Sequence, residues 1–225
     1  PPEPPPDRTP VPAPDQLAFE APYVQLAGAL SSADLAALAD DAGFLQVVGA
    51  RPANSNTYQL RVALEGGSYA DAGNYDWCPT ALVVEAADHV STEFTLSSPS
   101  LLDRVSLGSA ALWGDEIVRV DALDAETLAV TLARGCADTV RQLHAAGDRI
   151  WFHEGWTGSD RTEYAAAEQV SAKLLSRTGT AMLAEASAPA SSLTFDGRQA
   201  RPYPPAGLTI NTEAYPDYLY GPLVL

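Results

Sequence analysis

The most regularly patterned part of the sequence is residues 113–152, which read WGDEIVRVDALDAETLAVTLARGCADTVRQLHAAGDRIWF. Apolar residues alternate within 117–120 and again within 128–132, on either side of the turn-rich segment 121–126. Alternation with a period of two is typical of half-buried β-strands, so this part is predicted to form a β-hairpin. The hairpin marks the surrounding chain as a β-rich scaffold.

The second half of this segment is predicted to hold a short helix before a third strand. Residues Ala137–Ala146 place their larger apolar side chains on one helical face, and Gly147 stands where a C-terminal cap belongs. Residues 148–152 return to an extended pattern. The predicted unit is therefore strand, turn, strand, a corner at Arg134-Gly135-Cys136, short helix and strand.

A series of short motifs runs through the same segment in a fixed order. They are Glu116-Ile-Val-x-Val120, Leu128-x-Val130, Arg134-Gly135-Cys136-x-Asp138-Thr139, His144-x-x-Gly147 and Ile150-Trp151-Phe152, followed downstream by Arg198, Arg201-Pro-Tyr-Pro-Pro205 and Leu208–Asn211. In this order the motifs resemble the central tail-tip, or baseplate hub, proteins of long-tailed bacteriophages, the host-specificity type of tail protein. The resemblance covers most of the chain from Tyr23 onward.

The resemblance implies a structural virion protein of the phage tail tip or baseplate, made in the host cytoplasm. Such a protein is a homo-oligomer, a trimer around the tail axis. It links the tail tube to host-recognition modules and contacts the distal tail, tape measure and fibre components. No catalytic motif comes with the resemblance, so no enzyme activity, cofactor or metal is expected. The motif residues expected to be structural are Arg134, Gly135, Asp138, Thr139, His144, Gly147 and Trp151.

Length and composition favour a mainly β protein. The chain has 225 residues, 46% of them hydrophobic, with 18 prolines and 16 glycines spread through it. That distribution is typical of many short strands joined by turns rather than of a helical bundle. We expect β-barrel or sandwich-like modules with a few short helices and proline-rich connecting arms.

The charge balance excludes two classes of partner. With 13 Lys and Arg against 29 Asp and Glu, the net charge is −16, which repels nucleic-acid phosphates and anionic lipids. No apolar run approaches the roughly 20 residues of a membrane span. The sequence therefore predicts no stable nucleic-acid binding and no membrane span. In a hub, an acidic channel lining would keep DNA from adhering.

Proline-rich stretches suggest the domain organisation. Residues 1–22 are predicted as an extended arm, since eight of the first fourteen residues are proline. Residues 23–200 form the β-rich domain, with a possible subdomain break near 98–100, and residues 201–225 form a linker and the start of a following module. The sequence lacks an initial Met and stops on a strand-like apolar run, which predicts a piece of a longer polypeptide.

Within the β-rich domain, Ser31 is predicted to cap a short helix that stops at Gly43. Tyr23, Val24 and Leu26 are expected to anchor the start of the ordered region. Further strands are predicted at 44–48, 58–64, 81–85, 92–97 and 193–195. Residues 163–175 are ambiguous by pattern, and the resemblance favours an extended arrangement that ends in a strand.

A long loop from Gly66 to Pro79 is predicted to interrupt the strands. Its aromatic residues have two interpretations: a recognition surface, or rings that fold back on the core, which is favoured because aromatic rings bury large areas. The alternative function is therefore a carbohydrate- or peptide-binding β domain of a multidomain surface protein. The recognition residues would be Tyr69, Tyr75, Trp77 and Trp156.

The sequence gives little support for an enzymatic function. His153-Glu154 begins a zinc-protease pattern, but Thr157 stands where the second histidine belongs. Cys136, Asp138 and His144 have the residue types of a catalytic thiol triad. The alternative interpretation, which is favoured, is a structural corner in which Asp138 and Thr139 cap the helix.

The acids and cysteines give no stronger signal. The adjacent acids Asp115 and Glu116 would point to opposite faces of a strand, so they cannot flank one glycosidic bond. The sequence leaves open a disulfide between Cys78 and Cys136, although two buried thiols are the prediction.

Overall fold

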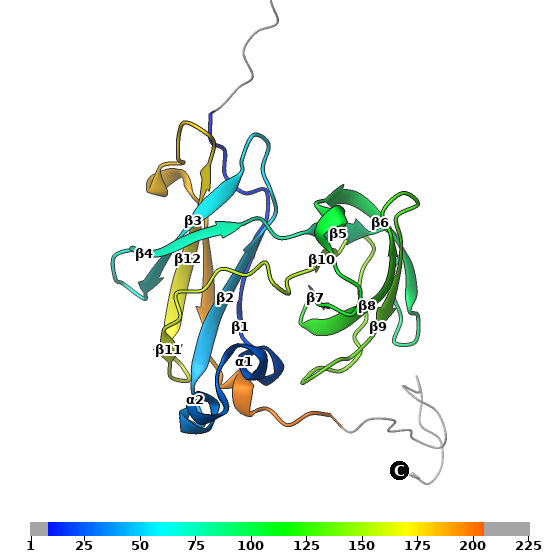
Figure 1. The fold of residues 1–225 in the computed structure, drawn as a ribbon, viewed down its shortest axis with the longest axis horizontal. Helices are drawn as coiled ribbons and strands as arrows, with labels where there is room; N and C mark the ends of the chain where they lie inside the picture. The colour runs from blue at the N-terminus through cyan, green and yellow to red at the C-terminus, as the bar shows by residue number, and fades with distance from the viewer. Residues whose placement is uncertain (1–8, 205–225) are drawn as a thin grey trace, which may run out of the picture.

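The computed structural model describes residues 9–204, which form two β-rich lobes (Figure 1). One lobe is a closed six-stranded barrel with the strand order β10-β5-β6-β9-β8-β7. Every pairing in the barrel is antiparallel. Its strands are β5 (Thr80–Val83), β6 (Glu93–Ser100), β7 (Ala110–Trp113), β8 (Glu116–Asp124), β9 (Ala129–Ala133) and β10 (Arg149–Trp151). The mainly β class and the barrel are therefore confirmed.

The second lobe, called here the sheet lobe, combines two antiparallel sheets. The larger has the order β13-β12-β3-β4 and the smaller β1-β2-β11. Their strands are β1 (Gln16–Glu20), β2 (Gly43–Gly49), β3 (Thr57–Leu64), β4 (Ala70–Asp76), β11 (Glu163–Tyr164), β12 (Gln169–Arg177) and β13 (Ala190–Thr194). Leu45 and Val47 of β2 meet Leu60 and Leu174 of the larger sheet, and all four side chains are fully buried. Apolar burial between the sheets thus forms the core of this lobe.

Two short helices, α1 (Tyr23–Ala29) and α2 (Ser32–Ala37), lie at one end of the sheet lobe (Figure 1). The predicted cap of α2 is confirmed, because the Ser31 hydroxyl accepts a hydrogen bond from the Asp34 N–H at 3.2 Å. The predicted stop at Gly43 is wrong, because the helix ends at Ala37 and Gly43 begins β2. Helix α1 was not predicted. Of the three expected anchors, Leu26 is buried, whereas Tyr23 and Val24 are exposed.

The two lobes are joined by an apolar cluster and by ion pairs. Phe19 and Val48 of the sheet lobe pack with Leu112, Ile117 and Trp151 of the barrel. At the edges of this contact, Arg149 pairs with Asp15 and Arg198 with Asp138, each at 2.7 Å. The chain passes between the lobes at residues 77–79. Residues 98–100, where the sequence suggests a subdomain break, are the last residues of barrel strand β6.

Several local predictions are confirmed and two are wrong. The hairpin of β8 and β9 and the extended character of 148–152 and 163–175 are all present. The predicted loop 66–79 is wrong in part, since β4 pairs with β3 as an edge strand. The predicted helix over 137–146 is also wrong, because the segment is extended and turn-like and leaves Val140 and Leu143 exposed. The predicted strand at 208–211 lies outside the described residues.

Candidate functional site

A buried carboxylate lies at the centre of the patterned segment. Glu116 is the first residue of β8, and its side chain is fully shielded from solvent. Gly114 makes the turn before it with a φ of +58°, a left-handed conformation that favours glycine. Strand alternation then directs Glu116 toward the barrel interior with Val118 and Val120, whereas Asp115 is exposed. The two adjacent acids face opposite ways, as the sequence predicts.

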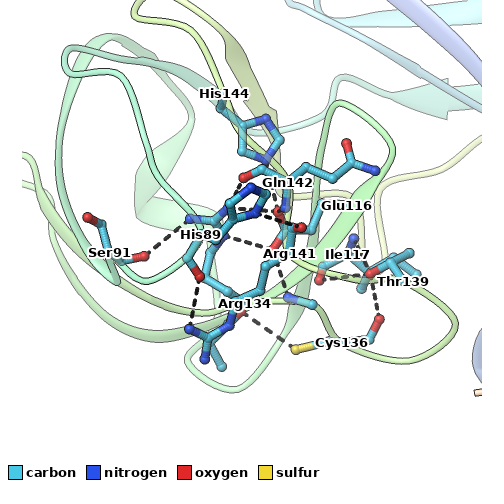
Figure 2. A network of polar contacts seen from close by, with 12 residues as sticks. His89, Ser91, Glu116, Ile117, Arg134, Cys136, Thr139, Arg141, Gln142 and His144 are labelled. Carbon is cyan, nitrogen blue, oxygen red and sulfur yellow. Dashed lines mark hydrogen bonds and ion pairs between the residues drawn. The ribbon is translucent and has the colours of Figure 1, made fainter. Parts of the chain in front are cut away.

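Five hydrogen bonds converge on the Glu116 carboxylate (Figure 2). The Arg134 guanidinium donates twice, from Nε at 2.7 Å and from Nη2 at 2.8 Å. The backbone N–H groups of Gly135 and Gln142 donate at 2.7 and 2.9 Å. His144 Nε2 lies 2.9 Å from Oε2. A bidentate arginine and two backbone donors are the arrangement that keeps a buried carboxylate ionised.

Arg134 satisfies its remaining donors on three backbone carbonyls. Nη1 donates to Asp88 and Ser91 at 3.2 Å each, and Nη2 donates to Gln142 at 2.7 Å. The guanidinium carbon also lies 4.9 Å from the centre of the Trp113 ring. Arg134 therefore fixes the loops around 88–91 and 142 to the end of the barrel.

His144 completes the network from the side of the barrel end. Its ring stacks on Trp113 at 3.9 Å with an interplanar angle of 11°. Its backbone forms an isolated bridge with Ala87, which ties the segment to the loop after β5. Gly147, with a φ of +90°, then makes the turn into β10. In the His144-x-x-Gly147 motif, His144 thus supplies the imidazole of the network and Gly147 makes the turn that follows.

The surroundings of Glu116 keep its carboxylate ionised. Burial alone would raise the pKa of Glu116, but the hydrogen bonds from His144, Arg134 and the Gln142 backbone outweigh it and lower the pKa to about 2. The nearby Asp88 pKa is also lowered to about 2, because the backbone N–H groups of Ser91 and Val90 bind its carboxylate. Glu116 is therefore ionised at neutral pH and is unsuited to proton transfer there.

The corner at residues 135–139 completes the packing of the motif residues. Gly135 has a φ of +62°, and an added Cβ would lie 2.9 Å from the Arg141 nitrogen. The Thr139 hydroxyl accepts from the Ile117 N–H at 3.0 Å and donates to the Cys136 carbonyl at 2.7 Å. The corner is therefore closed by a side chain, not by a helix cap.

The residue types of the thiol triad are each committed to other partners. Asp138 is paired with Arg198 across the lobe contact, and His144 is bound to Glu116. Burial raises the pKa of the Cys136 thiol, which donates toward the Ala133 carbonyl at 3.6 Å. Both cysteines are free thiols, Cys78 buried and Cys136 half-buried.

The four aromatic recognition candidates separate into different places. Trp77 lies in the sheet-lobe core, where its indole N–H donates to the Ser55 hydroxyl at 3.0 Å. Tyr69 contacts Ser171 and Lys173 on the other side of the larger sheet. Tyr75 and Trp156 come together and line one shallow hollow of about 230 Å³. Trp151 packs in the lobe contact.

The structure also shows buried polar residues that sequence reasoning missed. The Arg198 side chain donates to the Asp138 carboxylate and to the Glu20 backbone carbonyl. The two carboxylate oxygens of Glu20 accept from the backbone N–H groups of Asp196 and Arg198. Gln46 and His153 are buried as well, and both ring nitrogens of His153 lack a hydrogen-bond partner among the described residues. In the sequence, such a residue could be recognised only as a polar residue within an apolar strand pattern, as at Gln46.

Residues 9–204 contain no cluster of three or more His, Cys, Asp or Glu able to hold a metal ion. In the same range no helix is long and apolar enough to cross a membrane. Compared with known proteins, the chain matches no protein-family model and no curated protein.

Proposed function

We propose that this chain is a structural module of the tail-tip or baseplate hub of a long-tailed bacteriophage. The observation that supports the proposal is the Glu116 network. The residues by which the sequence resembles hub proteins, among them Glu116, Arg134, Gly135 and His144, form one buried scaffold. Motif residues that build a rigid barrel end fit a protein whose task is assembly.

The lobe contact supports the same role. Arg198 and Asp138, whose side chains are 9% and 1% exposed, form an ion pair that fixes the barrel to the sheet lobe. The buried apolar cluster around Phe19 and Trp151 adds to this contact. A module held rigid in this way can transmit its position to the modules on either side, as a hub around an axis requires.

An exposed apolar patch supplies a surface for assembly. Val90, Val140 and Leu143 are 57%, 51% and 69% exposed. They lie on the loops that Arg134 binds at the barrel end. Exposed apolar side chains on loops that are held to a rigid base are typical of protein contacts. In the proposed trimer this patch meets a neighbouring subunit or another tail protein, and the acids face the lumen or the exterior.

The test is a reconstruction of the intact tail tip. Three copies should surround the axis, with few Asp or Glu side chains between subunits. Placement of the module off the axis, without threefold contacts, would contradict the proposal.

A matched pair of variants tests the patch in assembled particles. Leu143→Asp should reduce the incorporation of the protein at least tenfold while leaving the melting temperature unchanged. Leu107→Asp alters a residue that is 65% exposed in the loop before β7, and it should assemble normally. Equal incorporation of the two variants would contradict the role of the patch.

A further inference from the structure

The sheet lobe carries a hollow of about 510 Å³ between helix α1, strand β2 and residues 157–161. It adjoins the hollow of about 230 Å³ beside Trp156, because Tyr75 and Thr157 line both. We call the two together the Tyr75 groove. The residues of its larger part that matter below are Gln25, Leu26, Phe44, Gln46, Tyr75 and Arg161.

Gln46 gives the groove a buried polar group that the fold leaves without a partner. It lies on β2 between Leu45 and Val47, which face the core, so alternation directs its side chain to the opposite face with Phe44. It is only 8% exposed, and its carboxamide makes no hydrogen bond to any residue of the range 9–204. Its amide atoms are not among the fully buried unpaired atoms, so they keep contact with the solvent in the groove and are available to a ligand there.

A second carboxamide, Gln25 on α1, lines the same hollow. The Gln25 Oε1 atom is shielded from solvent and has no hydrogen-bond partner in the described part of the chain. Each carboxamide offers two donors and one acceptor oxygen. Two unpartnered carboxamides therefore present both donors and acceptors to one space, which suits a ligand with several hydroxyl groups.

Arg161 adds an uncommitted positive charge at the rim. Its guanidinium has no ion pair or hydrogen bond with the residues that the structure describes. Its backbone has a φ of +60°, and its N–H donates to the Ser159 hydroxyl at 3.1 Å. In a chain of net charge −16, an arginine without a partner beside a polar groove favours a carboxylate-bearing ligand.

The apolar lining completes a surface for a sugar ring. The Tyr75 ring is held in place, because its hydroxyl donates to the Ser159 carbonyl at 2.5 Å and lies 3.2 Å from the Ala72 carbonyl, a second acceptor. Phe44 and Leu26 line the hollow as well. Pyranose rings have an apolar C–H face and a polar hydroxyl edge, so fixed aromatic and apolar side chains beside amides match both.

We propose that the Tyr75 groove binds a saccharide that carries a carboxylate, such as a uronic acid unit. Gln46 and Gln25 would bind hydroxyl groups, Arg161 the carboxylate, and Tyr75 a ring face. An extended peptide fits less well, because β2 is paired on both edges, with β1 and with β11 and Gly158, and offers no free strand edge. This proposal does not depend on the assembly role proposed above.

The experiment applies the protein to an array of immobilised oligosaccharides in which neutral and uronic-acid-containing glycans are matched for length. Saturable binding is expected to carboxylated members, and at least tenfold weaker binding to their neutral counterparts. Gln46→Leu and Arg161→Asn should each weaken the binding at least tenfold. The melting temperature of Gln46→Leu should be unchanged or higher, because the natural amide makes no internal hydrogen bond.

Two controls alter the same residue types elsewhere, Gln59→Leu on β3 and Arg119→Gln on β8, and both should bind as the natural chain does. A parallel array of extended peptides separates the two ligand classes. The proposal is overturned if no glycan binds, if binding survives both groove variants, or if only peptides bind and Gln46→Leu abolishes that binding.

Discussion

The Glu116 network at the barrel end contrasts with two buried polar side chains of the sheet lobe and the lobe contact. In the barrel, Glu116 is fully buried and accepts five hydrogen bonds. In the sheet lobe and at the lobe contact, Gln46 is 8% and His153 is 3% exposed, and neither side chain has a hydrogen-bond partner among the described residues. The difference teaches that a buried polar side chain with all its hydrogen bonds made helps to hold the fold together. A side chain without them is a candidate for binding a ligand or for a change of protonation.

The largest effect is expected from breaking the satisfied network on one side. Arg134→Met leaves the Glu116 carboxylate buried with its main counter-ion removed, so the free energy of unfolding should fall by about 3–5 kcal/mol. Urea unfolding followed by tryptophan fluorescence measures this.

The double variant Glu116→Leu, Arg134→Met is the control. It removes both charges, so it should recover much of the stability lost by Arg134→Met alone. A loss below 1 kcal/mol for the single variant, or a double variant no more stable than the single one, would contradict a buried ion pair here.

His153, at the lobe contact, should make the stability of the protein depend on pH. Burial lowers the pKa of His153 to about 4, and the positive charge of Arg198 adds to the effect. In the unfolded chain the pKa is about 6.5. Between these values the unfolded chain binds more protons, so stability falls by about 3 kcal/mol as the pH drops through this window.

His153→Phe should remove that part of the pH dependence, because phenylalanine keeps the edge contact with Phe19 and cannot be protonated. Thermal unfolding of both proteins at pH 7.5, 6, 5 and 4 measures the difference. Parallel curves for the two proteins would show that His153 does not titrate in this way.

A backbone effect of intermediate size is expected at the corner. Gly135→Ala should destabilise by about 2 kcal/mol, since its φ is +62° and the new Cβ would meet the Arg141 backbone. Gly155→Ala is the matched control, with a φ of +82° and open space around it. It should lose about 1 kcal/mol for the backbone strain alone. Equal losses in thermal unfolding would mean that the corner has room.

The smallest effect is expected on the barrel surface. Arg119 pairs with Asp121 on the same strand β8, but both side chains are substantially exposed. Solvent and side-chain entropy cancel most of the gain from such a pair. Arg119→Gln should therefore leave the melting temperature unchanged within error. A loss close to that of Arg134→Met would show that burial does not decide the strength of these pairs.

Local patterns predict most of the barrel. The alternation within 117–132 predicts β8 and β9, and the Ser31 cap predicts α2, because each signal is carried by residues close in sequence. Strand β4 escapes prediction because Gly73, Asn74 and its aspartates disfavour strands, and it forms by pairing with β3.

Long-range contacts explain the remaining failures. The segment 137–146 has a helical pattern, but the Gln142 backbone N–H donates to Glu116 and its carbonyl accepts from Arg134. Tertiary hydrogen bonds replace the helical ones. The Tyr75 groove is likewise assembled from residues more than a hundred positions apart, so no local pattern could reveal it.

The central claim is that Glu116 is a permanently ionised centre of the scaffold. Carbon-13 NMR of the Glu116 carboxyl, titrated from pH 7 to pH 3, tests it most directly. With a pKa lowered to about 2, the resonance should stay at its ionised position throughout. A titration midpoint near the ordinary value of about 4.3 would contradict the account.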